Sequence, residues 1–201
     1  MSGAAIILVL TLGVSLIGLF SPKVIQRTVL RPYAIAHGTD YVTLLTSGFV
    51  HADATHLLFN LITFYSFAFP LERAIGTTPF VALYFSGLLL SGIGTCVKHR
   101  NEPTYASLGA SGAILAVLFA SIVYFPRQSL FILPIPLPIP APLFALAYLA
   151  FSYYSSRQNA AGRSQDRINH DAHIFGALTG LAFVLVTDPR QFSALLHNLF
   201  G

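Results

Sequence analysis

Six apolar stretches, each almost free of charged residues, dominate the sequence. They cover residues 4–20, 52–69, 79–97, about 105–125, 142–154 and 172–186. A helix needs about 20 apolar residues to cross a bilayer. A typical soluble domain is about 25% charged, whereas 9% of this chain is charged and its mean hydropathy is +0.71. The sequence therefore predicts an all-α, multi-pass membrane protein with six spans, folded as a single domain over residues 1–201.

The composition also argues against several kinds of partner and cofactor. Lys and Arg residues are scattered singly between the apolar stretches, unlike the clustered basic surface that binds nucleic acid. The single cysteine, Cys96, excludes an internal disulfide framework and a cysteine-rich metal site. We therefore expect membrane lipid as a partner, and neither nucleic acid nor metal.

The connections between the stretches carry signals of their own. Residues 21–50 mix basic and apolar side chains, which favours a first loop lying at the membrane interface. Pro70 is expected to end the second span, because proline costs a helix one hydrogen bond. Five alternating prolines in residues 133–142 forbid a helix and favour an extended, polyproline-like loop. Residues 191–200 are expected to form a short surface helix.

Polar residues within the spans are candidates for function, because ionisable groups are costly in a bilayer. The first cluster is His51, His56 and Asn60, near the start of the second span. His56 and Asn60 are four residues apart and so share one face of a helix. The simpler interpretation is a pair of interfacial histidines and an asparagine that bonds to a neighbouring helix.

The second cluster surrounds Ser111, which follows Gly109 and Ala110 and precedes Gly112 at the start of the fourth span. One interpretation is the packing of small residues against another helix. The other is a nucleophilic serine, which needs a base to remove its proton at neutral pH. The Gly-x-Ser-x-Gly motif of soluble hydrolases is not met, because residue 113 is alanine.

The third cluster, residues 170–176, begins the sixth span. His173, Gly176 and Gly180 lie at i, i+3 and i+7 and so share a face that can pack closely on another helix. His170 and His173 could also bind a metal, but the further ligands of a metal site are missing. All three clusters begin even-numbered spans, so we expect them on the same side of the membrane, where their side chains can meet.

Together these motifs resemble the rhomboid family of intramembrane serine proteases. The matching segments are residues 109–112 (Gly-x-Ser-Gly), residues 172–176 (Ala-His-x-x-Gly), the pattern of His51, His56 and Asn60, and residues 72–76 (Glu-Arg-x-x-Gly). They follow the family's order over about residues 40–186. The resemblance implies the minimal bacterial form of the fold, a bundle of six transmembrane helices with a membrane-embedded first loop.

The resemblance further implies that Ser111 and His173 form a catalytic dyad without a third acid. Ser111 would attack the peptide carbonyl while His173 takes its proton. The backbone N–H of Ser111 and the side chains of His56 and Asn60 would bind the oxyanion. The substrates implied are transmembrane proteins whose helices locally unwind, cut near small residues, without a cofactor or metal. The supporting motif residues are His51, Gly109, Gly112 and Gly176.

Two departures from the family pattern lie near the expected dyad. Leu115, one turn after Ser111, replaces an aromatic residue that often stacks on the catalytic histidine. Phe175 replaces a small residue in the last span, and we expect it to hold the fourth and sixth spans slightly further apart. Neither change removes a catalytic group.

The orientation in the membrane receives two opposing indications. The connections on the side of the three clusters hold eight of the basic residues, and the opposite side holds three: Lys23, Arg27, Arg31, Lys98, Arg100, Arg157, Arg163 and Arg167 against Arg73, Arg127 and Arg190. The positive-inside rule would place the eight in the cytoplasm, whereas the resemblance places that face outside. We adopt the family orientation, in a bacterial inner membrane.

Two other functions remain open. A catalytically silent rhomboid-like protein would bind membrane helices, although such proteins usually lack the serine or the histidine, and both are present. A small transporter could use His56, Asn60 and His173 as an intramembrane proton or metal path. The inverted repeat of many carriers is, however, not visible in the sequence.

Overall fold

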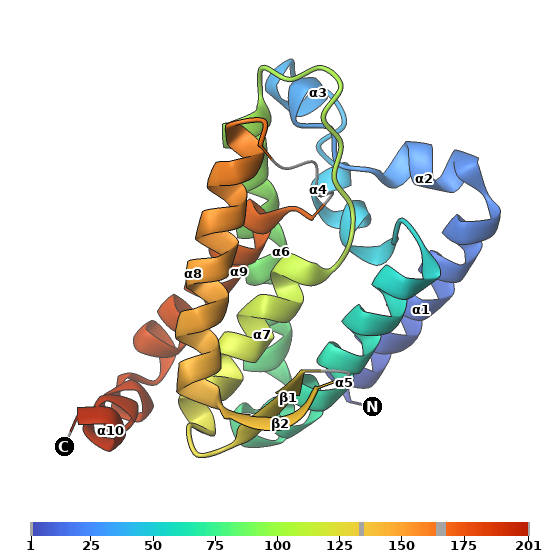
Figure 1. The fold of residues 1–201 in the computed structure, drawn as a ribbon. Helices are drawn as coiled ribbons and strands as arrows, with labels where there is room; N and C mark the ends of the chain where they lie inside the picture. Colours follow the sequence, from blue (N-terminus) through green and yellow to red (C-terminus); the bar gives the residue numbers. More distant parts are fainter. Residues whose placement is uncertain (1, 133–134, 164–167, 201) are drawn as a thin grey trace.

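The computed structural model describes residues 2–132, 135–163 and 168–200, and it is mostly helical. The six longest helices of the described residues form one bundle (Figure 1). They are α1 (Gly3–Phe20), α5 (Ala54–Ile75), α6 (Thr77–His99), α7 (Ser111–Tyr124), α8 (Ala141–Ala160) and α9 (His170–Thr187). Each of them corresponds to one apolar stretch of the sequence.

Four of these helices, α1, α5, α6 and α9, are long and apolar enough to cross a membrane. Helix α7 is apolar but has only 14 residues. Large apolar side chains also face outward from the bundle, including Val9, Leu58, Leu146 and Val186. A soluble protein would bury or replace many of these side chains, whereas lipid solvates them at no cost. The chain is therefore an integral membrane protein.

Helix α7 is the centre of the bundle. Every residue from Gly112 to Val123 is buried, and Figure 1 shows α7 between α8 and α9 on one side and α5 and α1 on the other. A helix that is apolar on all faces is expected where protein surrounds it completely. The candidate serine thus begins the most enclosed helix of the fold.

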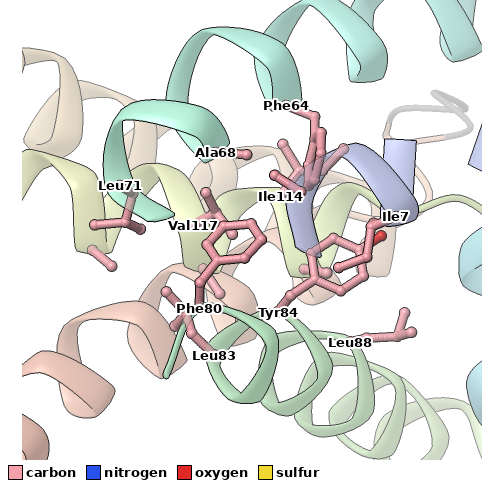
Figure 2. Close-up of a cluster of buried hydrophobic side chains, with 14 of the residues drawn as sticks. Ile7, Phe64, Ala68, Leu71, Phe80, Leu83, Tyr84, Leu88, Ile114 and Val117 are labelled. Atoms are coloured by element: carbon pink, nitrogen blue, oxygen red, sulfur yellow. The ribbon is translucent and has the colours of Figure 1, made fainter. Parts of the chain in front are cut away.

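The main core fills the space between α1, α5, α6 and α7 (Figure 2). The ring of Phe64 meets Tyr84 and Phe80 nearly edge to face, with centroids 5.6 and 6.3 Å apart. Ile114 of α7 and Leu71 of α5 complete this part of the core. Edge-to-face rings gain from their quadrupoles as well as from packing, so these ring pairs fix α5 against α6.

The prediction that Pro70 ends the second helix is wrong, because α5 continues through it to Ile75. The turn after Pro70 is held by Glu72, whose buried carboxylate accepts bonds from the N–H groups of Gly3 (2.7 Å) and Ala4 (3.1 Å). It also accepts from the hydroxyls of Thr77 (2.8 Å) and Ser2. The Glu-Arg motif therefore caps the N-terminus of α1, where unpaired N–H groups favour a negative charge.

The prediction of a loop over residues 133–142 is corrected by a short β-hairpin, which also departs from the all-α expectation. Strand β1 (Ser129–Ile132) pairs antiparallel with β2 (Ile135–Pro140), while residues 133–134 lie outside the described part. The segment is extended, as the prolines require. Prolines two apart place their nitrogens on one edge, which leaves the N–H groups of the alternate residues for pairing. The N–H of Ala141 continues this pattern by donating to Gln128 (3.0 Å).

The first connection and the tail contain short helices. Residues 21–50 form α2 (Pro22–Thr28), α3 (Pro32–Ala36), α4 (Thr43–Thr46) and the 3-10 turn Ser47–Phe49. Figure 1 shows them beside one end of the bundle. The expected helix of the tail is confirmed as α10 (Pro189–Phe200). The position of the first connection relative to the membrane stays a prediction.

Candidate active site

Ser111 is the first residue of α7, and the backbone before it is fastened to the first connection. The N–H of Gly109 donates to the carbonyl of Ser47 (2.9 Å), and Leu30 and Ser107 exchange backbone bonds of 2.9 and 3.0 Å. Gly109 has a φ of +114°, which a residue with a Cβ rarely adopts. The turn before Ser111 therefore requires glycine at position 109, and backbone hydrogen bonds to Ser47 and Leu30 hold it in place.

The backbones of α7 and α9 touch at the level of the candidate dyad. A Cβ added to Gly176 would lie 2.1 Å from the carbonyl oxygen of Gly112. Gly112 directly follows Ser111, and Gly176 lies one turn after His173 on the same helix face. The contact therefore brings the beginnings of α7 and α9, with Ser111 and His173, to the same end of the helix pair.

The expectation that Phe175 separates these two helices is wrong. Its ring lies over Gly94 of α6, where an added Cβ would come within 2.3 Å of it, and 41% of the residue is exposed. Phe175 is adjacent to Gly176 and so points to a different side of α9. The large side chain fills the space between α9 and α6, and the contact of Gly112 with Gly176 is unaffected.

Asn169 connects the beginning of α9 to its neighbours. Its side-chain oxygen accepts from the N–H of Ala172 (3.0 Å), which caps α9. Its amide group donates to the hydroxyls of Thr95 in α6 and Ser107 before α7, each at 3.0 Å. One amide thus fixes α6, α9 and the segment that leads to Ser111 relative to one another.

His56 and Asn60 approach the turn before Ser111 from α5. An added Cβ at Gly109 would lie 3.1 Å from Nε2 of His56 and 3.8 Å from Nδ2 of Asn60. The positions are four residues apart on α5, so both side chains reach the same turn. The three sequence clusters meet at one end of the bundle, as predicted from their places at the starts of the even-numbered spans, while the catalytic roles of the residues stay predictions.

His51 joins this group through a chain of hydrogen bonds that begins in α1. The hydroxyl of Ser15 donates its one proton to the carbonyl of Phe49 (2.9 Å) and lies 2.8 Å from Nδ1 of His51. Ser15 must therefore accept from Nδ1–H. Nε2 of His51 then has a lone pair, which accepts from Nδ2 of Asn60 at 2.8 Å.

Burial, and after it the nearby His56, lower the pKa of His51 to about 4, so the ring is neutral at pH 7. Only a neutral ring can both donate at Nδ1 and accept at Nε2. The chain from Ser15 through His51 consequently fixes the direction of the Asn60 amide and leaves its second hydrogen for another acceptor.

Asp171 lies two residues before His173 in the sequence, but its carboxylate is bound by other partners. Its carboxylate binds the ammonium group of Lys98 (2.7 Å) and the hydroxyl of Ser156 (2.7 Å). These bonds join the ends of α6 and α8 to α9. Nδ1 of His173 instead lies 2.8 Å from the hydroxyl of Tyr148 in α8. The dyad without a third acid is compatible with these contacts.

A cavity of about 440 Å³ lies at the opposite end of α7, around Tyr124, Arg127 and Gln191. None of the predicted site residues lines it. Hydrolysis at Ser111 would also need water, so the rhomboid resemblance implies a polar cavity there that opens to one face of the membrane. That cavity stays a prediction.

Three residues of this site were missed by sequence reasoning. Asn169 had a usable signal, because an asparagine immediately before an apolar helix is a common N-cap. Ser15 and Tyr148 had none, since single polar side chains in apolar helices occur in many membrane proteins for packing alone.

A family model described as "Rhomboid domain" matches residues 38–190. The chain belongs to the rhomboid family. It is 32% identical over 161 residues to a Bacillus subtilis (strain 168) protein named "Putative rhomboid protease YdcA", covering 78% of this chain and 73% of that one. It is 29% identical over 168 residues to the human "Presenilin-associated rhomboid-like protein, mitochondrial", covering 80% of this chain and 42% of that one.

An Arabidopsis thaliana protein named "RHOMBOID-like protein 12, mitochondrial" is 30% identical over 112 residues, 47% of this chain and 33% of that one. The chain thus spans about three quarters of the bacterial relative but less than half of the mitochondrial relatives. The rhomboid match contains His56, Asn60, Ser111 and His173, whereas Ser15 precedes it.

Proposed function

We propose that the protein is an intramembrane serine endopeptidase that hydrolyses peptide bonds in or near the transmembrane helices of other membrane proteins. The observation that supports this best is the contact of Gly112 with Gly176, which brings Ser111 and His173 to the same end of α7 and α9. Packing of small residues alone would explain that contact. It would not explain why His56 and Asn60 also converge on the turn before Ser111.

In the first step, Oγ of Ser111 attacks the substrate carbonyl carbon as Nε2 of His173 takes the hydroxyl proton. The carbonyl π electrons move to the oxygen, which becomes an oxyanion. When this intermediate collapses, the C–N bond breaks and the imidazolium returns the proton to the leaving amine. Water repeats the sequence on the acyl-enzyme, releasing the acid and restoring Ser111.

The oxyanion is bound by the N–H of Ser111 and by the side chains of His56 and Asn60. An N–H in the first turn of a helix has no partner within that helix, and the helix dipole adds positive potential there. The remaining amide hydrogen of Asn60 is directed by His51. Preorganised donors of this kind are worth about 10²–10³ in rate each.

In this proposal α7 and α8 complete six spans, and the site faces the outside of a bacterial inner membrane. Helix α8 has 20 residues, the length of a span, and the Bacillus subtilis relative supports a bacterial membrane. The basic residues on the same side oppose this orientation. Protease protection of a tag at each terminus, in intact cells and inverted vesicles, decides between the two sides.

The test of function is cleavage of a labelled transmembrane-helix substrate by purified protein in detergent, beside Ser111→Ala and His173→Ala. We expect cleavage by the wild type alone, with both variants folded as judged by their melting temperatures. Failure of the wild type across a panel of helices with small residues and helix breakers would favour the silent helix binder. Equal cleavage by all three proteins would exclude this dyad.

A further inference from the structure

Helix α8 contributes one polar group to the candidate dyad, the hydroxyl of Tyr148, which lies 2.8 Å from Nδ1 of His173. The sequence showed leucine at the position one turn after Ser111, where family members often carry an aromatic residue. In the structure Leu115 is buried in a cluster with Phe119, and its hydrocarbon side chain has no group that could hydrogen-bond to an imidazole. The contact with the imidazole comes instead from a different helix.

The ring of Tyr148 is held on two sides. It stacks on Phe144 with centroids 5.5 Å apart and an angle of 25°, and Phe119 of α7 lies 6.4 Å away. Its hydroxyl is consequently placed by the packing of the ring. The ring centroids of Tyr148 and His173 are 6.1 Å apart, so the hydroxyl contact, rather than ring stacking, connects the two side chains.

The proposed dyad chemistry requires a hydrogen-bond acceptor at the position of the Tyr148 hydroxyl. His173 can act as a base only if Nε2 has a lone pair, which places the proton of the neutral ring on Nδ1. After proton transfer both ring nitrogens are donors. In each state Nδ1–H needs an acceptor, and the oxygen of Tyr148 is within hydrogen-bond distance of it.

We propose that Tyr148 is a positioning residue that accepts from Nδ1–H of His173, holding Nε2 as the base and stabilising the imidazolium. This inference rests on the proposed function. Tyr148 then does with a neutral oxygen what a carboxylate does in a three-residue triad. A neutral acceptor avoids burying an extra charge in the bundle. The carboxylate nearest in sequence, Asp171, is bound to Lys98 and Ser156.

The test compares Tyr148→Phe, which removes one oxygen and keeps the ring, with the matched control Tyr154→Phe on the same helix, where 62% of the tyrosine is exposed. The readouts are kcat and KM for a labelled transmembrane substrate and the rate at which a fluorophosphonate labels Ser111. We expect Tyr148→Phe to lower kcat and the labelling rate between about ten- and a hundredfold, as for the loss of a hydrogen bond to a charged group. KM and the melting temperature are expected to stay at the wild-type values.

A structural role alone would lower the melting temperature and leave the kcat of the folded protein unchanged, and that result would overturn the inference. So would wild-type kcat and labelling in Tyr148→Phe. If Ser111→Ala is inactive while Tyr148→Phe equals the wild type, the inference fails and the proposed function stands.

A second measurement does not depend on turnover. The ¹⁵N shifts of the His173 ring report which nitrogen carries the proton. We expect Nδ1–H in the wild type and a shift toward Nε2–H in Tyr148→Phe. Nε2–H in the wild type would mean that Tyr148 donates instead, and would overturn the inference whether or not a substrate is cut.

Discussion

Replacing Gly176 with alanine is expected to push α9 away from α7 beside the candidate dyad. The new Cβ would lie 2.1 Å from the carbonyl oxygen of Gly112, and ordinary contact begins at about 3.4 Å. The helices must therefore separate by about 1.3 Å along this line, because neither backbone has a flexible end that could turn aside. Overpacking of this kind costs about 1–3 kcal/mol of folding free energy. A misplacement of about 1 Å between reacting groups costs about 10²-fold in rate.

Two matched variants separate the effect on stability from the effect on the site. Gly180→Ala meets the carbonyl of Ala116 at 2.2 Å, nearly the same clash, but one turn further from His173. Gly13→Ala in α1 meets nothing within 4 Å and is expected to be neutral or slightly stabilising. We expect Gly176→Ala and Gly180→Ala to melt alike, with the larger loss of activity in Gly176→Ala.

The chain supplies its own reporter for this assay. It has no tryptophan and a single cysteine, Cys96, which is buried. A dye that fluoresces on reaction with thiols will therefore report unfolding in detergent, and fluorophosphonate labelling of Ser111 will report the site. If Gly176→Ala melts and labels like Gly13→Ala, the close contact of α7 and α9 is refuted.

Three further predictions follow from the same contacts. Asn60→Ala is expected to lower kcat about 10²–10³-fold with little change in KM. A loss of kcat/KM that comes entirely from weaker substrate binding would contradict an oxyanion role. Glu72→Gln should lower the free energy of unfolding by about 1.5–3 kcal/mol, because a charged acceptor of four hydrogen bonds becomes neutral. Melting followed with the thiol dye measures this loss, and an unchanged melting temperature would exclude the role of Glu72 in capping α1. The pKa of His51 is lower in the folded than in the unfolded protein. Its contribution to folding stability is therefore complete above about pH 6.5, where the ring is neutral in both states, and is lost as the pH falls toward 4. Melting by circular dichroism should show this loss in the wild type and less of it in His51→Gln.

The helices of the bundle were predictable because their signal is strong and local. Each apolar stretch became a helix, since backbone groups in a bilayer must bond within their own segment. The meeting of His56, Ser111 and His173 at one end was also predictable, because helices that begin on one side of a membrane share a depth. Resemblance added the order of the motifs and their expected roles.

The partners of single polar side chains were not predictable. The contacts of Ser15 with His51 and of Tyr148 with His173 depend on how far each helix is rotated about its axis, which an apolar sequence does not specify. Pro70 was misjudged for a related reason, because bonds to Glu72 from α1 and α6 hold the turn that follows it. Phe175 was misjudged because one step along α9 turns its side chain toward Gly94.

The length of α7 has a consequence for how the protein fits its membrane. Fourteen residues of helix are about 21 Å long, whereas the hydrocarbon layer of a bilayer is about 30 Å thick. In the proposed six-span arrangement at least one end of α7 lies within this thickness, and a helix this short in contact with lipid would be accommodated by local thinning of the bilayer. Protein surrounds α7 on all sides, so the helix does not meet lipid and has no such mismatch. A change in bilayer thickness should therefore affect the outer helices, while the packing of the bundle sets the depth of Ser111.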